Sequence, residues 1–307
     1  MALTAVGLTN GGVTAHYGFR YDDSLAPPLN PGGPEPARTN AVIAACENDF
    51  NIMTGWFGNI ALDVNVPIAV NITQNAGGAS WLLNNGNLGV TINASTGLAS
   101  FVRYLLVAEM VEQLMRAQGG AQGGGWFGPG TEGSDGEGLS RFLAAQFLVL
   151  NGLGNPPSGF TNSNLWLSSS RPDWVNKTAA NDGPDQFTGC SLLFIYYLFN
   201  QLGFSLNAIV AAASPSLAGV YYNLTGDSAD PFLAFKLLLD TAFPGTSIIT
   251  RGNLDNPFPL PSAAVLSTLR FMRKTEPGIK VLRLISSKGA SSLRAALNSD
   301  RAASLVE

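Results

Sequence analysis

The hydrophobic pattern of this chain changes its period once, near residue 98. Ahead of that point two runs, 62–73 and 86–93, are rich in β-branched residues, and the turn-forming residues Asn-Asn-Gly lie between them. Beyond residue 98, apolar residues recur mainly at the three- and four-residue spacing of buried helix faces, as far as about residue 243. Strands that come first and helices that follow predict an α+β fold, with a small N-terminal sheet and a mainly helical C-terminal half.

Two long helices are expected next to this sheet. Over residues 40–56 the apolar side chains fall on one helical face, and Thr39 is the expected N-terminal cap. A second long helix is expected over residues 98–118, where the pair Gly119-Gly120 ends it. The first of these helices is expected to cover the sheet, because a flat apolar face needs such a partner.

The chain is expected to have three parts. Residues 1–36 combine a strand over 13–21 with a proline-rich connector, and residues 37–261 form the main domain. Residues 262–307 form a basic helical tail. From Arg270 onward there are eight Lys or Arg and three acidic residues, a net charge of +5 against −9 for the rest. The tail either packs on its own acidic domain or docks onto a partner or a second copy of the chain.

Composition excludes several classes of protein. With 46% hydrophobic and 12% charged residues, the chain is too apolar to be disordered, and a net charge of −4 offers no basic field for nucleic acid. Its apolar runs stop well short of the roughly 20 residues that a bilayer span requires, so no transmembrane segment is expected. Residues 1–14 lack the pattern of a signal peptide, which predicts a soluble protein and leaves its compartment open.

Few residues are available for metal or nucleophile chemistry. The chain has one histidine, His16, and two cysteines, Cys46 and Cys190, so a site made of several imidazoles or thiolates is excluded within one chain. No Gly-x-Ser-x-Gly motif is present, which disfavours a serine hydrolase. The two cysteines lie in apolar runs and are expected to be buried free thiols, with one long-range disulfide as the alternative.

Two motifs carry a resemblance to a known family. The long helix contains Ala108-Glu109-Met110-Val111-Glu112, and a later helix opens with Glu137-Gly138-Leu139-Ser140-Arg141. In this order they resemble the gluzincin branch of the zincin metallopeptidases, where His-Glu-x-x-His binds zinc and a later glutamate is the third ligand. The likeness covers roughly residues 38–245. It implies a zincin-like domain in which both histidine positions are lost and Glu109 keeps the position of the general base.

The resemblance also implies a changed metal preference. Ala108 offers no ligand atom, and zinc prefers nitrogen and sulfur, so catalytic zinc is not expected. Glu112 and Glu137 would instead suit a hard cation such as Ca²⁺, Mg²⁺ or Mn²⁺, if any metal binds.

Two further interpretations of the acidic residues stay open. Glu109, Glu112 and Glu137 could form a metal-free hydrolytic site, because crowded carboxylates separate their pKa values into an acid and a base. Alternatively, Glu112 and Arg116 form an ordinary ion pair on the helix surface, one turn apart, and Glu109 faces solvent.

Three aromatic residues are candidates for the edge of a binding cleft. Trp126 and Phe127 belong to a glycine-rich segment, 119–136, that is expected to be a mobile loop beside the cleft. They either contact a ligand or fold inward to cover the cleft. Tyr197, in a later helical segment, is the third candidate.

The expected function is therefore that of a pseudo-metallopeptidase, which keeps the fold and the cleft and binds a peptide, a protein partner or copies of itself. The enzymatic alternative is a hydrolase that uses Glu109 as base, with Glu112 and Glu137 binding a hard cation or supplying the acid. The structural alternative is self-assembly, in which the basic tail docks onto the acidic body of a neighbour.

Overall fold

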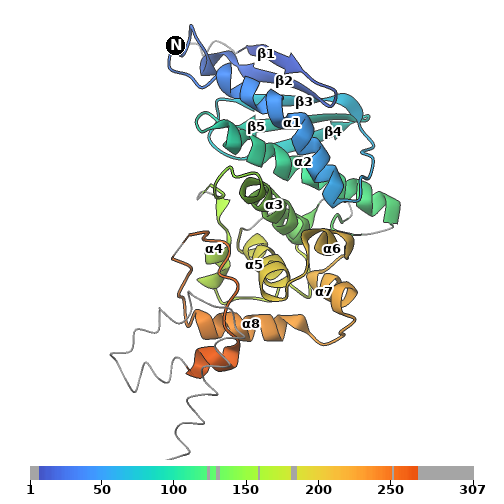
Figure 1. Ribbon diagram of the computed structural model, residues 1–307, viewed down its shortest axis with the longest axis vertical. Helices are drawn as coiled ribbons and strands as arrows, with labels where there is room; N and C mark the ends of the chain where they lie inside the picture. The colour runs from blue at the N-terminus through green and yellow to red at the C-terminus, as the bar shows by residue number, and fades with distance from the viewer. Residues whose placement is uncertain are drawn as a thin grey trace, which may run out of the picture.

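The computed structural model describes residues 7–122, 125–128, 132–157, 160–180, 185–250 and 252–268. It consists of a five-stranded sheet with two long helices on one face, followed by a helical half (Figure 1). This arrangement confirms the predicted α+β fold. Residues 263–268 form a short helix, and the remainder of the predicted basic tail lies outside the described residues. Within the described part, no helix has the length and apolar character needed to cross a membrane.

The sheet has the order β1-β2-β3-β5-β4. Its outer pairs, β1 with β2 and β4 with β5, are antiparallel, and its central pairs are parallel. The strands are β1 (Leu8–Val13), β2 (Tyr17–Asp22), β3 (Asn65–Thr73), β4 (Ala79–Asn84) and β5 (Asn87–Asn93). The predicted single strand over 13–21 is wrong, because the chain turns at Thr14, whose backbone N–H donates to the Tyr17 carbonyl at 2.8 Å.

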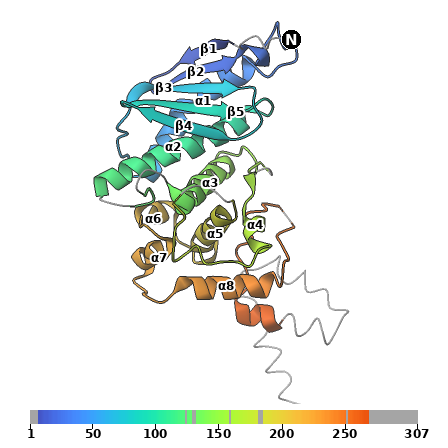
Figure 2. The same cartoon turned by 180° about the vertical axis from the view of Figure 1, so that it is seen from behind.

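Helices α1 (Ala37–Trp56) and α2 (Ala99–Gln122) cover one face of the sheet, and the other face is seen in Figure 2. The covered face of β3 carries Ile68, Val70 and Ile72, all fully buried. The alternation of these residues with exposed or half-buried ones along β3 is the period-two pattern of a strand that is buried on one side.

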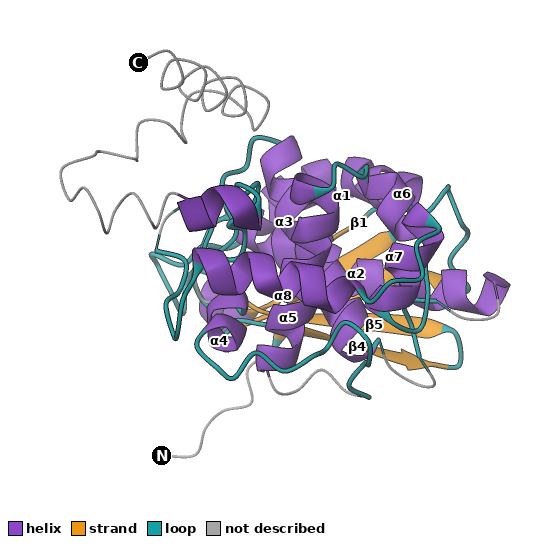
Figure 3. Ribbon diagram, turned by 90° about the horizontal axis from the view of Figure 1, so that it is seen from below, coloured by secondary structure: helices purple, strands orange, loops and turns teal. Residues whose placement is uncertain are grey.

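The helical half packs on the far side of α2. It comprises α3 (Gly133–Leu150), α4 (Ser163–Leu167), α5 (Asp185–Tyr196), a π-helical turn (Tyr197–Gln201), α6 (Leu206–Ala211), α7 (Leu217–Thr225) and α8 (Pro231–Ala242). α3 packs between α2 and α5, and the sheet lies behind these helices when the molecule is viewed from the helical end (Figure 3). Cys46 and Cys190 are free and buried, as expected.

Local chemistry explains where several helices begin. Side chains of Ser205, Ser216 and Asp230 accept hydrogen bonds from the first-turn N–H groups of α6, α7 and α8. α1 begins two residues before the predicted cap, and Glu35, not Thr39, supplies the acceptor: its carboxylate takes hydrogen bonds from the backbone N–H and the hydroxyl of Thr39. The prediction that Gly119-Gly120 ends α2 is also wrong, since the helix continues to Gln122.

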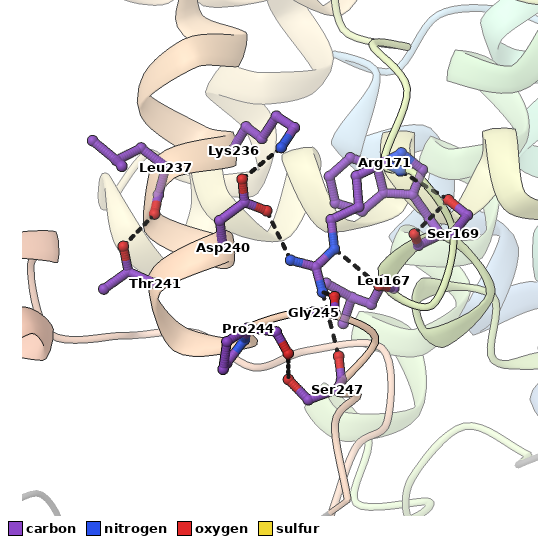
Figure 4. A network of polar contacts seen from close by, with 11 residues as sticks. Leu167, Ser169, Arg171, Lys236, Leu237, Asp240, Thr241, Pro244, Gly245 and Ser247 are labelled. Carbon is purple, nitrogen blue, oxygen red and sulfur yellow. Dashed lines mark hydrogen bonds and ion pairs between the residues drawn. The ribbon is translucent and has the colours of Figure 1, made fainter. Parts of the chain in front are cut away.

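A buried arginine ties the end of α4 to the end of α8 (Figure 4). Arg171 has a left-handed backbone, with φ of 54°, and is only 4% exposed. Its guanidinium donates to the carbonyls of Leu167 and Gly245 and pairs with Asp240 at 2.8 Å. A buried guanidinium needs such acceptors, so this one residue fixes three separate segments of the helical half.

The crossing of α3 and α5 requires a glycine. A Cβ atom at Gly138 would lie 2.7 Å from the Cβ of Ser191 and 3.1 Å from the backbone nitrogen of Leu192. Gly138 follows Glu137 directly, so the close approach of these helices also sets the position of the Glu137 carboxylate.

We therefore expect Gly138→Ala to lower the free energy of unfolding by about 1–3 kcal/mol, because the extra methyl group overpacks the α3–α5 contact. Gly55→Ala is the matched control: Gly55 also lies in a helix, and nothing lies within 4 Å of a Cβ placed there. Urea unfolding of both variants checks this, and an equal effect of the two changes would contradict it.

Candidate functional site

A cleft of about 320 Å³ opens where the beginning of β4 faces α2 and α3. Residues 78–81 form one wall, α2 contributes the second, and the first turns of α3 form the third. The acidic residues that line it are Glu109, Glu112, Glu132 and Glu137, with Arg141 as the one basic residue among the lining side chains. The cleft lies at the sheet edge, where β4 has a partner on one side only within the described chain.

α2 places two of the carboxylates. Glu109 and Glu112 are 8% and 5% exposed, and both line the cleft together with Ala108. Trp81, from β4, donates its indole N–H to Glu112 Oε2 at 2.7 Å. The interpretation that Glu112 pairs with Arg116 on the helix surface is therefore wrong: Glu112 is buried toward β4, and Arg116 Nε instead donates to Gln113.

Burial and like charges raise the pKa of Glu112 well above its ordinary value. Loss of hydration on burial is the largest cause, followed by the negative charge of Glu109, and then by Glu137 and Glu132. The hydrogen bond from Trp81 acts in the opposite direction, because it favours the ionised carboxylate. Glu112 therefore takes up a proton more readily than an ordinary glutamate does.

α3 places the carboxylate on the opposite wall. Glu137 Oε1 pairs with Arg141 Nε at 2.5 Å, one helical turn later. Arg141 also donates from Nη1 to Asn162 Oδ1 at 2.5 Å. The guanidinium is therefore held between α3 and the beginning of α4, and it supplies one positive charge beside the acidic group.

Three carboxylates converge in this cleft. Oxygen atoms of Glu112, Glu132 and Glu137 all lie within 4.8 Å of one another. Sequence reasoning missed Glu132 because it lies in the glycine-rich segment; its position directly before α3, five residues ahead of Glu137, is the signal that could have identified it. Glu109 and Glu112, from α2, and Glu137, from α3, line the same cleft, which is the arrangement that the sequence motifs predicted.

The donor set decides which cation could be held. It contains carboxylate oxygens and no imidazole or thiolate, and Ala108, which also lines the cleft, offers no ligand atom. Oxygen ligands of this kind suit Ca²⁺, Mg²⁺ or Mn²⁺, with Glu112, Glu132 and Glu137 as the ligands. Arg141 competes for one of them, because it already neutralises Glu137.

The three candidate aromatic residues do not line this cleft. Trp126 is 2% exposed, donates its indole N–H to the Val210 carbonyl at 3.1 Å, and lines a separate cavity. Phe127 is partly buried and packs against Trp81, a residue of the cleft wall, with ring centroids 6.4 Å apart. Tyr197 is buried in an aromatic cluster with Phe235 and Phe258. Trp126 thus folds inward, as one alternative expected, but it lines a different cavity and not the acidic cleft.

Comparison with protein-family models, with curated proteins and with solved structures finds no match to this chain.

The raised pKa of Glu112 has a consequence for stability. The folded state binds a proton at Glu112 more tightly than the unfolded state does. The contribution of this proton to the free energy of unfolding is therefore fully present below the ordinary glutamate pKa, about 4.3. It is lost as pH rises from there through the pKa of Glu112 in the folded state. We expect Glu112→Gln to abolish this loss, because glutamine does not ionise, and its amide oxygen can still accept the Trp81 hydrogen bond.

Urea unfolding at pH 5, 6.5 and 8 measures it, and the variant should gain stability over wild type as pH rises. Asp63→Asn, which removes an exposed carboxylate outside the cleft, controls for net charge. Wild type and Glu112→Gln with parallel pH profiles would contradict the expectation.

Proposed function

We propose that this chain is a zincin-like protein without zinc-peptidase chemistry, and that its acidic cleft binds an extended peptide segment carrying a positively charged side chain. The observation that carries the proposal is the convergence of Glu112, Glu132 and Glu137 beside the outer edge of β4. The backbone edge and the carboxylates together supply the two kinds of contact that recognition of such a segment needs.

The edge of β4 supports backbone recognition. β4 is the last strand of the sheet, and residues 78–81, at its beginning, form a wall of the cleft. An extended peptide that pairs with such an edge gains main-chain hydrogen bonds, while alternate side chains enter pockets on one side. The cleft lies where one of these side chains would enter.

The charges of the cleft support recognition of a cation. Four glutamates and one arginine are among the residues that line it, so acidic side chains predominate in the lining. Burial and, after it, repulsion from neighbouring carboxylates raise the pKa of Glu112, and a lysine or arginine side chain from a ligand would offset the repulsion. Such a contact binds the peptide and needs no catalytic step.

The zincin-like part of the proposal rests on the order of elements. α2 carries Ala108, Glu109 and Glu112 into the cleft, and α3 brings Glu137 to it from the other side. These are the relative placements that the sequence resemblance implies. Replacement of both histidine positions supports binding without zinc hydrolysis.

We expect an end-blocked pentapeptide with Val-Lys-Val at its centre to bind roughly tenfold more tightly than the same peptide with norleucine in place of lysine, because a charge-assisted contact is lost. Isothermal titration calorimetry at low salt measures both. Affinity for the lysine peptide should decrease when the salt concentration is raised from about 0.05 to about 0.5 M, because salt screens the attraction between the charges.

Glu132→Gln should abolish the preference for lysine, whereas Asp63→Asn should leave it unchanged. Equal affinity for the two peptides, or no binding of either, would contradict the proposal. Mass spectrometry of the recovered peptide separates binding from cleavage.

A hydrolase is the second candidate, favoured by the raised pKa of Glu112 directly beside Glu109. Such a pair can supply one protonated acid and one ionised base. In that case the peptide is cleaved, Glu109→Gln abolishes cleavage, and the rate depends on pH through an apparent pKa above the ordinary glutamate value.

Elemental analysis of dialysed wild type and Glu137→Ala tests the form of this hydrolase that uses a hard cation. About one equivalent of Ca or Mn in wild type that is lost in the variant supports this form. Wild-type protein that holds no metal and still cleaves the peptide excludes it.

A further inference from the structure

A carboxylate orients the only histidine of the chain, His16. This histidine lies near the β1 edge of the sheet, whereas the acidic cleft lies at the β4 edge. His16, in the turn between β1 and β2, places Nδ1 2.6 Å from Glu47 Oε2 of α1. Its backbone N–H donates to the other oxygen, Oε1, at 2.9 Å. Glu47 therefore holds both the backbone and the imidazole of His16.

This pairing selects one tautomer of the neutral ring. An ionised carboxylate only accepts hydrogen bonds, so Nδ1 must carry the hydrogen and Nε2 keeps its lone pair. The pKa of Glu47 lies below its ordinary value: burial acts to raise it, but the hydrogen bonds from Thr14 and His16 outweigh burial and keep the carboxylate ionised. The imidazole is further fixed by stacking on Phe50, with ring centroids 3.9 Å apart.

His16 lines a cavity of about 430 Å³ between the end of α1 and the beginning of β3. The other lining residues are mostly apolar, and Val66 is 56% exposed at its margin. They are Phe50, Thr54, Asn59, Ile60, Ala61, Leu62, Val64, Val66 and Ile68. The Thr54 hydroxyl uses its hydrogen within α1, so it can only accept from a ligand, and the other polar side chains of the lining are those of His16 and Asn59.

We infer that this cavity is a binding site for a small apolar molecule that bears a hydroxyl group, with His16 Nε2 accepting its hydrogen bond. A mainly apolar pocket of several hundred Å³ with a few placed polar groups is the usual form of a small-molecule site. Glu47 acts as the positioning residue, because it fixes the ring and its tautomer. The site goes beyond the proposed peptide cleft and shares no lining residue with it.

The test uses p-cresol and toluene, which share an apolar body and differ in the hydroxyl. Because the chain has a single histidine, one pair of imidazole ¹⁵N signals reports on the site without assignment. At pH 8, added p-cresol should move the ¹⁵N chemical shift of Nε2 in wild type from the range of an unprotonated nitrogen toward that of a protonated one. The shift should reach a plateau at high p-cresol concentration. Its affinity should exceed that of toluene roughly three- to tenfold, the value of one hydrogen bond.

Variants separate the hydrogen bond from the cavity. His16→Phe keeps a ring on Phe50 and removes Nε2, so p-cresol should then bind no more tightly than toluene. Ala61→Phe narrows the cavity and should weaken both ligands, while Glu47→Gln should shift the tautomer signals and reduce the preference for p-cresol. Equal affinity of wild type for the two molecules, absence of binding, or p-cresol binding with a stationary Nε2 signal would each overturn the inference.

Discussion

Burial of α2 on two sides is the constraint on which the rest of the structure depends. The helix packs against β4, β5 and α1 on one side and against α3 on the other, so almost every residue from Val102 to Met115 is buried. A helix of this kind carries apolar residues around most of its surface. Any polar side chain within it must therefore find a partner or a cavity. Glu109 and Glu112 reach the cleft, and this makes the acidic site a direct result of how the two halves join.

The spacing of apolar residues in the sequence predicted those helices and strands that bury one face in the core between the sheet and its helices. The central strands β3 and β5 and the helices α1 and α2 belong to this group, and their predicted bounds differ from the observed ones by a few residues. β4 was not predicted, because its pattern is short and its pairing with β5 settles its conformation. Gly119 and Gly120 do not end α2, since a glycine inside a helix costs only about 1 kcal/mol and does not by itself stop one.

Residues of the candidate site could be predicted where one helix carries them. They could not be predicted where contacts between segments far apart in the sequence set the position of a side chain. Glu109 and Glu112 share a helix, and the resemblance placed Glu137 opposite them. The hydrogen bond of Trp81 to Glu112 spans 31 residues, and that of Trp126 to the Val210 carbonyl spans 84. Neither partner is visible in a local pattern. The second bond turns Trp126 away from the acidic cleft and places it in the protein interior.

Arg141 limits how the three carboxylates of the cleft could hold a metal ion. A small divalent ion would need oxygen atoms from all three converging carboxylates, yet Glu137 is held by the guanidinium at 2.5 Å. Mg²⁺ in particular demands near-ideal octahedral geometry, so it gains least from a set in which one ligand is already neutralised. The proposed lysine or arginine side chain needs no octahedral set of ligands, so Glu137 can keep its arginine when such a side chain binds. This pairing is one reason to propose a cationic side chain, and not a metal ion, as the ligand of the cleft.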